Sequence, residues 1–353
     1  MRHLENGAMQ HCLHTARKLR ARADLTRTGA AIVRIFSDMM STWQKPFISL
    51  HRGGLTKSFH VVKEAEGYRR GEKILDPELA QRIMEEGGRL RPIRCPRSSL
   101  VHNALKAMAQ AIDLHHEAQF GFIKDRNCVE GAFLHRKAKS VLTIDILDAF
   151  EQVTEREVRY ILKHILDVNR IMATMIADLT CYQGRLYQGS PLAPALFNIR
   201  SLHAAERLTR LAAANGLICT IYADDITISS DKWSYFTRSF IKTVIRILAE
   251  EGLRVNKDKI HVTHQDPRTV GLTDITGLTI DYDDNGQPFV RPIHRGKYTK
   301  KAAYLKYLYD TYGIEYSREC ARDGTDKALV SVYQGLQNWS EVEKHGAQTF
   351  LFA

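Results

Sequence analysis

Two short segments of the sequence place carboxylates directly beside apolar, β-branched runs. Residues 217–229 carry Asp224 and Asp225 between two such runs, which predicts a β-hairpin with both carboxylates at its tip. Residues 141–150 contain another apolar run, which reaches Asp145 at its carboxyl end. A carboxylate beside buried apolar residues is costly unless a cation balances it. The two segments together therefore indicate a divalent-metal site.

Carboxylates on adjacent strands could hold two Mg²⁺ ions a few ångströms apart. Because successive side chains on a strand point to opposite faces, we expect Asp224 to join Asp145 as a ligand and Asp225 to be a weaker or structural one. Asp148 is a rival ligand, but we expect it on a turn. Taken alone, the Asp224–Asp225 pair is more typical of an ordinary polar turn, and only the Asp145 strand favours the metal site.

Two stretches rich in Lys and Arg flank these carboxylates in a chain of net charge +11, which points to a polyanionic partner. In residues 87–97, arginines alternate with apolar residues, which predicts a strand or hairpin with guanidinium groups on one side. Guanidinium groups bind phosphate oxygens bidentately, so this stretch is a candidate triphosphate or backbone clamp. Residues 291–306 hold six Lys or Arg among tyrosines, which favours nucleic-acid contact over a solvated helix face.

Helical and loop patterns connect these segments. Residues 1–45 predict amphipathic helices with a basic outer face, for which a solvated surface and nucleic-acid contact are equal alternatives. The polar stretch 53–71 suits a linker or an extended loop. Further helices are expected at 76–86, 100–115, 155–180 and 236–251, and a Gly/Pro-rich loop at 186–198 opens another that runs to residue 214.

Cysteines and histidines do not follow metal-binding spacings. We interpret the six widely separated cysteines as free thiols in a reducing cytoplasm. For the fifteen histidines, solvated or packing roles are favoured over zinc ligation. The chain has no apolar run of the length that spans a bilayer, so membrane insertion is not expected.

Taken in order from Arg89 to Tyr307, these segments resemble a reverse transcriptase. Residues 145–150 resemble the first catalytic motif of that family, an Asp followed five residues later by an aromatic residue. Residues 222–225 are similar to its catalytic hairpin. Three more segments resemble its loop and later motifs, namely 188–198, with Ala193 where Ser is usual, 252–259, and 275–278 of the primer-grip region.

Within that family, the chain most resembles the bacterial retron type. Residues 119–126 followed by 131–135 resemble the retron Asn-Ala-x-x-His element, with Gly131 in place of Asn. Residues 275–277 resemble its Val-Thr-Gly triplet, with Ile275 in place of Val. Each element differs from the retron pattern at one position.

The resemblance implies an α+β fold shaped as a right hand, with fingers, a palm built on an antiparallel sheet, and a helical thumb. The palm would carry the carboxylates. We expect an N-terminal helical extension at 1–75, fingers at 76–140, a palm at 141–285 that includes finger elements at 155–185, and a thumb at 286–353.

The chemistry implied by the resemblance is in-line attack of a primer hydroxyl on the α-phosphate of a deoxynucleoside triphosphate. Two Mg²⁺ ions would assist, with Mn²⁺ as a possible substitute, and the Ile146 carbonyl would complete one metal shell. Phe150 would clash with a 2′-hydroxyl and favour deoxynucleotides, and Lys259 could protonate pyrophosphate. The nucleotide site as a whole would consist of Arg89, Arg91, Phe150, Gln188, Gly189 and Lys259.

A retron enzyme copies part of a dedicated structured non-coding RNA into branched, RNA-linked single-stranded DNA (msDNA), primed from a 2′-hydroxyl of that RNA. The resemblance thus implies this RNA, dNTPs and the DNA product as partners, and antiphage defence with a separately encoded effector protein. Two alternatives stay open, a self-primed or template-independent defence enzyme and an inactive RNA-binding scaffold. The expected RNA contacts are His135, Arg295, Lys297, Tyr298, Lys300, Lys301, Tyr304 and Lys306.

Overall fold

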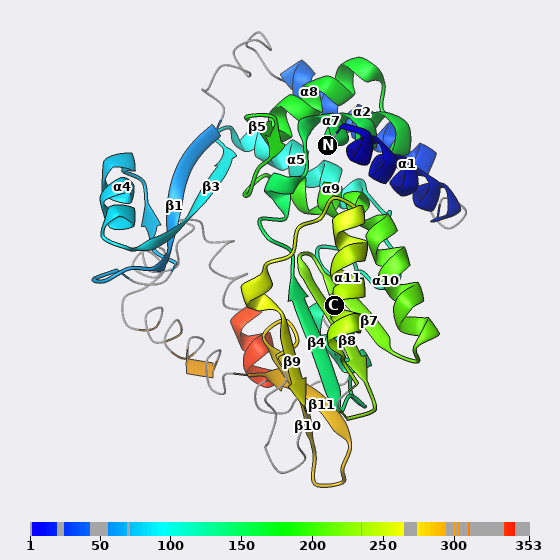
Figure 1. The fold of residues 1–353 in the computed structure, drawn as a ribbon. Coiled ribbons are helices and arrows are strands. Elements are labelled where there is room, and N and C mark those ends of the chain that lie inside the picture. Colours follow the sequence, from blue (N-terminus) through cyan, green and yellow to red (C-terminus); the bar gives the residue numbers. More distant parts are fainter. Residues whose placement is uncertain are drawn as a thin grey trace.

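Helices and antiparallel strands are mixed along the chain, which confirms the α+β class. Several helices gather at the top of the view in Figure 1, with a four-stranded sheet below them and a smaller sheet projecting to the left, and further helices flank each sheet. None of the helices described is both long and apolar enough to cross a membrane. The computed structural model describes residues 2–19, 25–42, 56–68, 71–233, 235–264, 274–293, 299–300, 303, 306, 310 and 335–342.

The four-stranded sheet, here called the palm sheet, is antiparallel with the order β7–β8–β4–β9. Ile144 lies opposite Ile226, and Leu142 opposite Ile228, and all four side chains are buried on one face. Helices α10 (Leu202–Ala214) and α11 (Arg238–Glu250) contribute to the same core and cover that face (Figure 1). The other face is therefore left for polar side chains. The strands are β4 (Ser140–Asp145), β7 (Ile218–Tyr222), β8 (Asp225–Ser230) and β9 (His261–His264).

The smaller sheet, here called the finger sheet, is antiparallel with the order β2–β1–β3. Helix α4 (Pro77–Glu85) packs on it through Ala80 and Ile83. The Asp76 side chain caps this helix by accepting a hydrogen bond from the Glu78 amide, which confirms the helix expected at 76–86. The strands are β1 (Thr56–Glu64), β2 (Lys73–Ile74) and β3 (Arg89–Pro96), and β3 confirms the strand expected from the arginine alternation.

Two expected boundaries differ in the structure. The linker or loop expected at 53–71 is wrong for residues 56–64, which form β1 and pair with β3 along their length. Of the β1 side chains described, only Val62 is fully buried. The polar sequence of this segment therefore gave no strand pattern, and its hydrogen bonds to the distant strand β3 define it as a strand. Residues 56–64 therefore belong to the same sheet as β3. The expected domain bounds stay a prediction. The boundary at 285 falls inside a hairpin of β10 (Leu278–Tyr282) and β11 (Pro288–Pro292).

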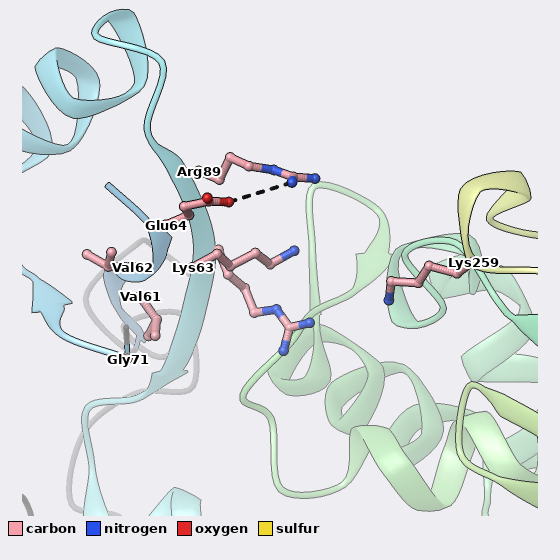
Figure 2. A pocket seen from close by; sticks show the side chains of 8 residues that line it. Val61, Val62, Lys63, Glu64, Gly71, Arg89 and Lys259 are labelled. Carbon is pink, nitrogen blue, oxygen red and sulfur yellow. Dashed lines mark ion pairs between the residues drawn. The ribbon is translucent and has the colours of Figure 1, made fainter. Parts of the chain in front are cut away.

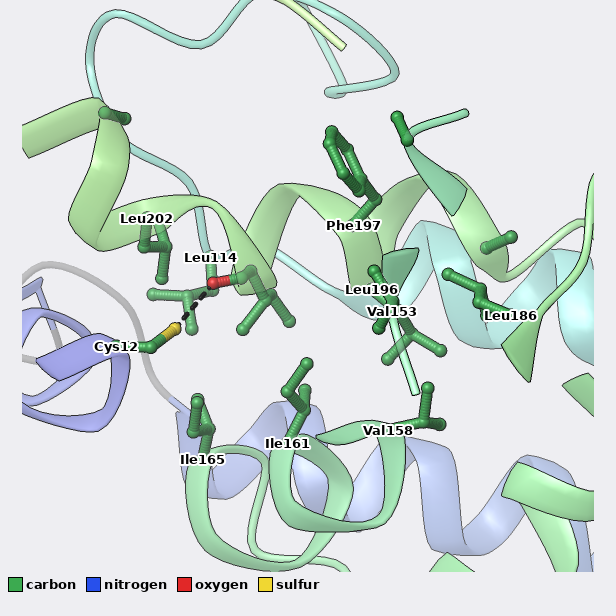
Figure 3. Close-up of a cluster of buried hydrophobic side chains, with 14 of the residues drawn as sticks. Cys12, Leu114, Val153, Val158, Ile161, Ile165, Leu186, Leu196, Phe197 and Leu202 are labelled. Atoms are coloured by element: carbon green, nitrogen blue, oxygen red, sulfur yellow. Dashed lines mark hydrogen bonds between the residues drawn. The ribbon is translucent and has the colours of Figure 1, made fainter. Parts of the chain in front are cut away.

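Helices α1 (Arg2–Leu19) and α2 (Leu25–Thr42) confirm the helices expected in residues 1–45. They belong to the main core, because Ile32 and Phe36 are fully buried and the Cys12 thiol donates to the Ile199 carbonyl at 2.8 Å. Figure 3 shows Cys12 reaching into this core. A Cβ atom on Gly29 would lie 2.2 Å from the Leu166 carbonyl oxygen, so α2 packs directly against the backbone of Leu166.

The remaining elements surround this core. They are α5 (Ser99–Ala111), α6 (Cys128–Leu134), η1 (Phe150–Gln152), α7 (Glu155–Tyr160), the π-helix η2 (Ile161–Ile165), α8 (Arg170–Thr180), β5 (Cys181–Tyr182), β6 (Arg185–Leu186), α9 (Ala193–Arg200) and η3 (Lys257–Lys259). The thumb expectation concerns residues that lie mostly outside the described ranges.

Candidate active site

The hairpin of β7 and β8 meets the end of β4 in a register that brings carboxylates together. Asp225, the first residue of β8, lies opposite Asp145 in β4 and opposite Tyr222 in β7. Directly opposite residues in antiparallel strands project on the same face. Asp145, Asp225 and Tyr222 therefore share the face of the palm sheet away from α10 and α11, which we call the carboxylate face. Asp224 lies in the two-residue turn, which confirms the predicted hairpin.

The pKa values of Asp224 and Asp225 are both raised at this site. Burial, together with the charges of Asp224 and Asp145, raises the pKa of Asp225 to about 7. Burial and the charge of Asp145 also raise the pKa of Asp224, against the opposing charges of Lys259 and Arg91. A bound cation would relieve this unbalanced negative charge. The donor set consists of oxygens, which suits Mg²⁺ or Mn²⁺.

The structure thus brings Asp145, Asp224 and Asp225 to one place. The ranking of Asp224 above Asp225 as a ligand stays a prediction, and so does ligation by the Ile146 carbonyl. The Ile146 amide donates to the Asp224 carbonyl at 2.9 Å, which holds the hairpin turn against the end of β4. Asp148 is exposed on the turn after β4, with a φ of 42°, as expected.

Lys259 lies at the β9 side of this site. The Asn256 amide donates to the Asp145 carbonyl at 2.8 Å, so the segment before η3 runs along the end of β4. The Lys259 ammonium is 2.9 Å from Asp145 Oδ1. The ammonium therefore balances one of the carboxylates expected to hold metal. The proton-donor role of Lys259 toward pyrophosphate stays a prediction.

A cleft of about 670 Å³ separates Lys259 from the finger sheet. Arg89 and Arg91 of β3 line it, as the sequence predicted for a phosphate clamp, and Arg89 pairs with Glu64 at 3.9 Å. Lys63 also lines it and was not predicted. Figure 2 shows Lys63 and Arg89 extending from the finger sheet toward Lys259.

Lys63 reaches the cleft because the β1–β3 register shifts between Val62 and Glu64. An irregularity of this kind inserts an unpaired residue and re-aims its side chain. The sequence signal for it was weak, since a single Lys in a polar stretch does not reveal a shift in strand pairing. The cleft thus carries four cationic side chains, at Lys63, Arg89, Arg91 and Lys259.

The loop that contains Gln188 and Gly189 packs directly against β3. The Arg94 amide donates to the Gln188 carbonyl at 2.9 Å. Gly189 has a φ of 105°, and a Cβ atom there would lie 2.3 Å from the Arg94 carbonyl oxygen, so only glycine fits. Both residues therefore lie at the finger sheet, and their contact with a nucleotide stays a prediction.

Phe150 begins η1, shortly after the turn that follows Asp145. Its ring is half-buried and packs edge-to-face on Phe197 of α9, with 5.8 Å between the ring centroids. This contact limits how far the Phe150 ring can move toward Phe197. Its role in sugar selection stays a prediction.

The RNA contact expected of His135 is wrong in this structure. The His135 side chain is 0% exposed, and its two ring nitrogens lie 2.6 Å from Ser229 Oγ and 2.7 Å from Thr220 Oγ1. Burial lowers the pKa of His135 to about 3, so the ring is neutral. His135 therefore joins α6 to the carboxylate face of the palm sheet and is a structural residue.

The other expected RNA contacts fall mostly outside the described residues. Of these, Lys300 and Lys306 are described, and both are exposed, with Lys306 Nζ 2.7 Å from Asp310 Oδ2. Their contact with RNA stays a prediction. The residues outside the described ranges are Arg295, Lys297, Tyr298, Lys301 and Tyr304.

Two histidines and a carboxylate, His11, His203 and Glu251, lie close enough together to be considered as a metal site. The rings of His11 and His203 are 4.7 Å apart, and His203 Nδ1 is 2.8 Å from Glu251 Oε1. Arg207 donates to the same Glu251 oxygen at 2.7 Å. The carboxylate is therefore already balanced by the arginine, which favours a packing role for these histidines.

An antiparallel sheet that carries three clustered carboxylates and faces a cationic cleft is the arrangement of a polymerase palm and fingers. Residues 83–307 match the family model described as reverse transcriptase (RNA-dependent DNA polymerase). The match covers well over half of the chain, so the chain belongs to this family.

Retron enzymes are among its relatives, which confirms the resemblance to the bacterial retron type. The chain is 30% identical over 191 residues to the retron Ec86 reverse transcriptase of Escherichia coli, covering 54% of this chain and 55% of that one. It is 28% identical over 219 residues to the retron Mx65 reverse transcriptase of Myxococcus xanthus, covering 56% and 50%. The chain thus spans about half the length of the curated relatives it matches.

Among solved structures, apo telomerase from Candida tropicalis matches with a TM-score of 0.49 and 10% identity, over 81% of this chain and 65% of that one. Telomerase from Candida albicans, bound to a fragment of telomeric RNA, matches with a TM-score of 0.44 and 11% identity, over 81% and 63%.

Proposed function

We propose that this protein is an RNA-directed DNA polymerase of the retron type. The observation that carries the proposal is the meeting of Asp145, Asp224 and Asp225 at one strand end, opposite a cationic cleft. Two Mg²⁺ ions, for which Mn²⁺ could substitute, would lower the pKa of the primer hydroxyl and neutralise charge at phosphorus when bound there. The residues around them bind and orient the reactants.

The reaction is an in-line displacement. The primer hydroxyl oxygen loses its proton to solvent and forms a bond to the α-phosphorus of a dNTP. The bond from that phosphorus to the bridging oxygen breaks, which releases pyrophosphate. Arg91 and Lys63 hold the triphosphate from the finger sheet, with Arg89 at the rim of the cleft. Lys259 lies across the cleft, where its ammonium can protonate the departing pyrophosphate.

The substrate strand is held on the carboxylate face of the palm sheet. A cleft of about 490 Å³ there is lined by Asp145, Asp225, Thr227, His261 and Asp274, among others. Phe150 lies at the nucleotide site and selects against nucleotides that carry a 2′-hydroxyl. The Ile146 carbonyl would help to hold one of the metal ions, and Gln188 with Gly189 would line the nucleotide site.

We further propose that the template is a dedicated structured non-coding RNA, primed from its own 2′-hydroxyl, in the cytoplasm. The support is the similarity to named retron reverse transcriptases, together with the basic residues Lys300 and Lys306 that follow the palm. The DNA product would stay joined to the RNA, and a separately encoded effector protein would act with the complex in antiphage defence.

The nucleic acid that copurifies with the protein from its native locus tests this proposal. After separate RNase and debranching treatments, sequencing should find a defined RNA joined to a short DNA through a 2′-linkage. Unlinked or protein-linked DNA would indicate the self-primed defence enzyme instead. RNA without DNA, at saturating dNTP, would indicate the inactive scaffold.

A further inference from the structure

Phe122 is an exposed aromatic residue beside the catalytic hairpin. It is 59% exposed, and its ring centroid lies 6.1 Å from that of Tyr222. Its φ of 58° lies in the left-handed region, which bulky L residues rarely adopt. Such a backbone conformation costs the free protein stability, and strained residues of this kind gather at ligand sites.

The loop before Phe122 is fastened to the hairpin by its backbone. The Phe120 amide donates to the Ile221 carbonyl at 2.8 Å, which adds this loop to the edge of β7. A Cβ atom on Gly121 would lie 2.6 Å from the Ala223 amide nitrogen, so the loop touches the catalytic turn itself. The Asn198 side chain donates to the Gly121 carbonyl at 2.8 Å. The position of Phe122 is therefore set by the same turn that carries Asp224.

The ring of Phe122 lies at the carboxylate face. Tyr222 is opposite Asp225, and Asp225 is opposite Asp145, so these three side chains form one row across the sheet. Phe122 extends that row by its contact with Tyr222. Lys124, two residues later, has a side chain that is 83% exposed and lies 4.0 Å from the carboxylate of Asp125, which is equally exposed.

We propose that Phe122 and Tyr222 form an aromatic platform for the terminal nucleotide of the primer strand, an inference that rests on the proposed polymerase function. The primer is the strand whose hydroxyl must reach the carboxylates, so its last nucleotide lies beside Asp225 and hence beside Tyr222. Aromatic rings bind nucleotides of any sequence, as a polymerase requires at a moving primer end. Lys124 would contact a backbone phosphate of the same strand.

Binding of a labelled DNA primer annealed to an RNA template tests the platform. Phe122→Ala should weaken binding by about tenfold, the size expected for loss of one base–aromatic contact. The KM for dNTP should stay unchanged, and Phe122→Tyr should restore binding. Trp233→Ala is the matched control, because Trp233 is a 47% exposed aromatic beyond β8, at the far end of the hairpin.

Phe122→Gly separates a binding role from a folding role. Glycine adopts a positive φ readily, so this variant should melt at the same temperature as the wild type or higher while binding primer as weakly as Phe122→Ala. A purely structural Phe122 predicts the reverse, a lower melting temperature with primer affinity lost only through unfolding. Normal primer binding by the folded Gly variant would overturn the proposal.

An abasic site identifies the strand that contacts the platform. Removing the terminal base of the primer should weaken binding to the wild type clearly more than binding to Phe122→Ala, since that variant has already lost the contact with Phe122. The same coupling to a template base would assign the platform to the template and overturn our assignment to the primer. If the wild type binds the duplex but does not extend it, the proposed polymerase function is wrong. The binding measurements would still show whether Phe122 contacts the terminal base of the primer.

Discussion

Lys259 and Asp145 form an ion pair of 2.9 Å at the place where the carboxylates converge. In the proposed mechanism, a lysine in this position would compete with a metal ion for the same oxygen, and it would also provide positive charge beside the leaving group. The two effects have opposite consequences for metal binding and for catalysis, so a substitution can separate them.

Lys259→Met should lower the Mg²⁺ concentration needed for half-maximal activity by about two- to fivefold, because a half-exposed ion pair contributes under about 1 kcal/mol. The maximal rate should fall at the same time, since the proposed proton donor to pyrophosphate is lost. Titration of activity with Mg²⁺ measures both quantities. Lys257→Met, in the same turn of 3₁₀-helix, is the control. A higher Mg²⁺ requirement in Lys259→Met would show that Lys259 does not compete with Mg²⁺ for Asp145.

Asp224→Asn should reduce DNA synthesis by at least about a thousandfold, because the carboxylate is expected to hold a cation that contributes several kcal/mol to catalysis. RNA binding should be nearly unchanged, since it depends on basic residues elsewhere. Removing divalent ions with EDTA should have the same effect on the wild type. Asp148→Asn, on the exposed turn after β4, should stay active. Persistent synthesis by Asp224→Asn would remove Asp224 from the metal site.

Lys63→Ala should raise the KM for dNTP by about tenfold, the size of one charge-assisted hydrogen bond to phosphate. Arg91→Ala should do the same, because both side chains line the cleft between the finger sheet and Lys259. Steady-state kinetics with a fixed primer–template measure this effect. Lys106→Ala, an exposed lysine on α5, should leave the KM as it is. An unchanged KM in both cleft variants would place the triphosphate elsewhere.

Phe150→Ala should increase ribonucleotide incorporation relative to deoxynucleotide incorporation by roughly 10- to 100-fold, the range for a steric pocket contact. The reason is that Phe197 supports the Phe150 ring, so the ring cannot yield to a 2′-hydroxyl. Competition between labelled dNTP and rNTP gives the ratio. Phe150→Tyr keeps the ring and should keep the selectivity. Equal rejection of ribonucleotides by wild type and Phe150→Ala would exclude a gate at this position.

His135 should make the protein less stable in acid. The unfolded residue has a pKa near 6.5, whereas burial lowers the pKa of the folded one to about 3. Between these values only the unfolded chain takes up the proton. Stability is therefore lost as pH falls below about 6.5, by up to about 1.4 kcal/mol per pH unit.

Urea unfolding of the wild type and His135→Asn between pH 7.5 and pH 4.5 measures this effect. The variant should be less stable at neutral pH, and the difference should shrink as pH falls because the variant lacks the titrating group. Thr220→Val removes a hydrogen-bond partner of His135 and keeps the ring, so it should keep the acid dependence. A pH-independent difference between wild type and His135→Asn would show that His135 does not titrate in this range.

Local sequence patterns determined the parts of the site that depend on residues close in the chain. The Asp224–Asp225 hairpin, the Asp145 strand end and the arginine strand β3 were predicted because period-two alternation and turn residues act over a few positions. The short helix from Pro77 was predicted for the same reason, since its Asp76 cap lies beside it in the sequence. The order of these segments was also sufficient to indicate the family.

The tertiary structure decided which distant residues meet. β1 became a strand through its pairing with β2 and β3, and the register shift in the pairing with β3 aimed Lys63 into the cleft. The ring of His135 is buried and forms hydrogen bonds with Ser229 and Thr220, which lie more than 80 positions later in the sequence. Phe122 contacts Tyr222 across 100 positions of the chain. Strand register and side-chain burial arise from hydrogen bonds and packing between remote segments, and no local pattern of residues specifies them.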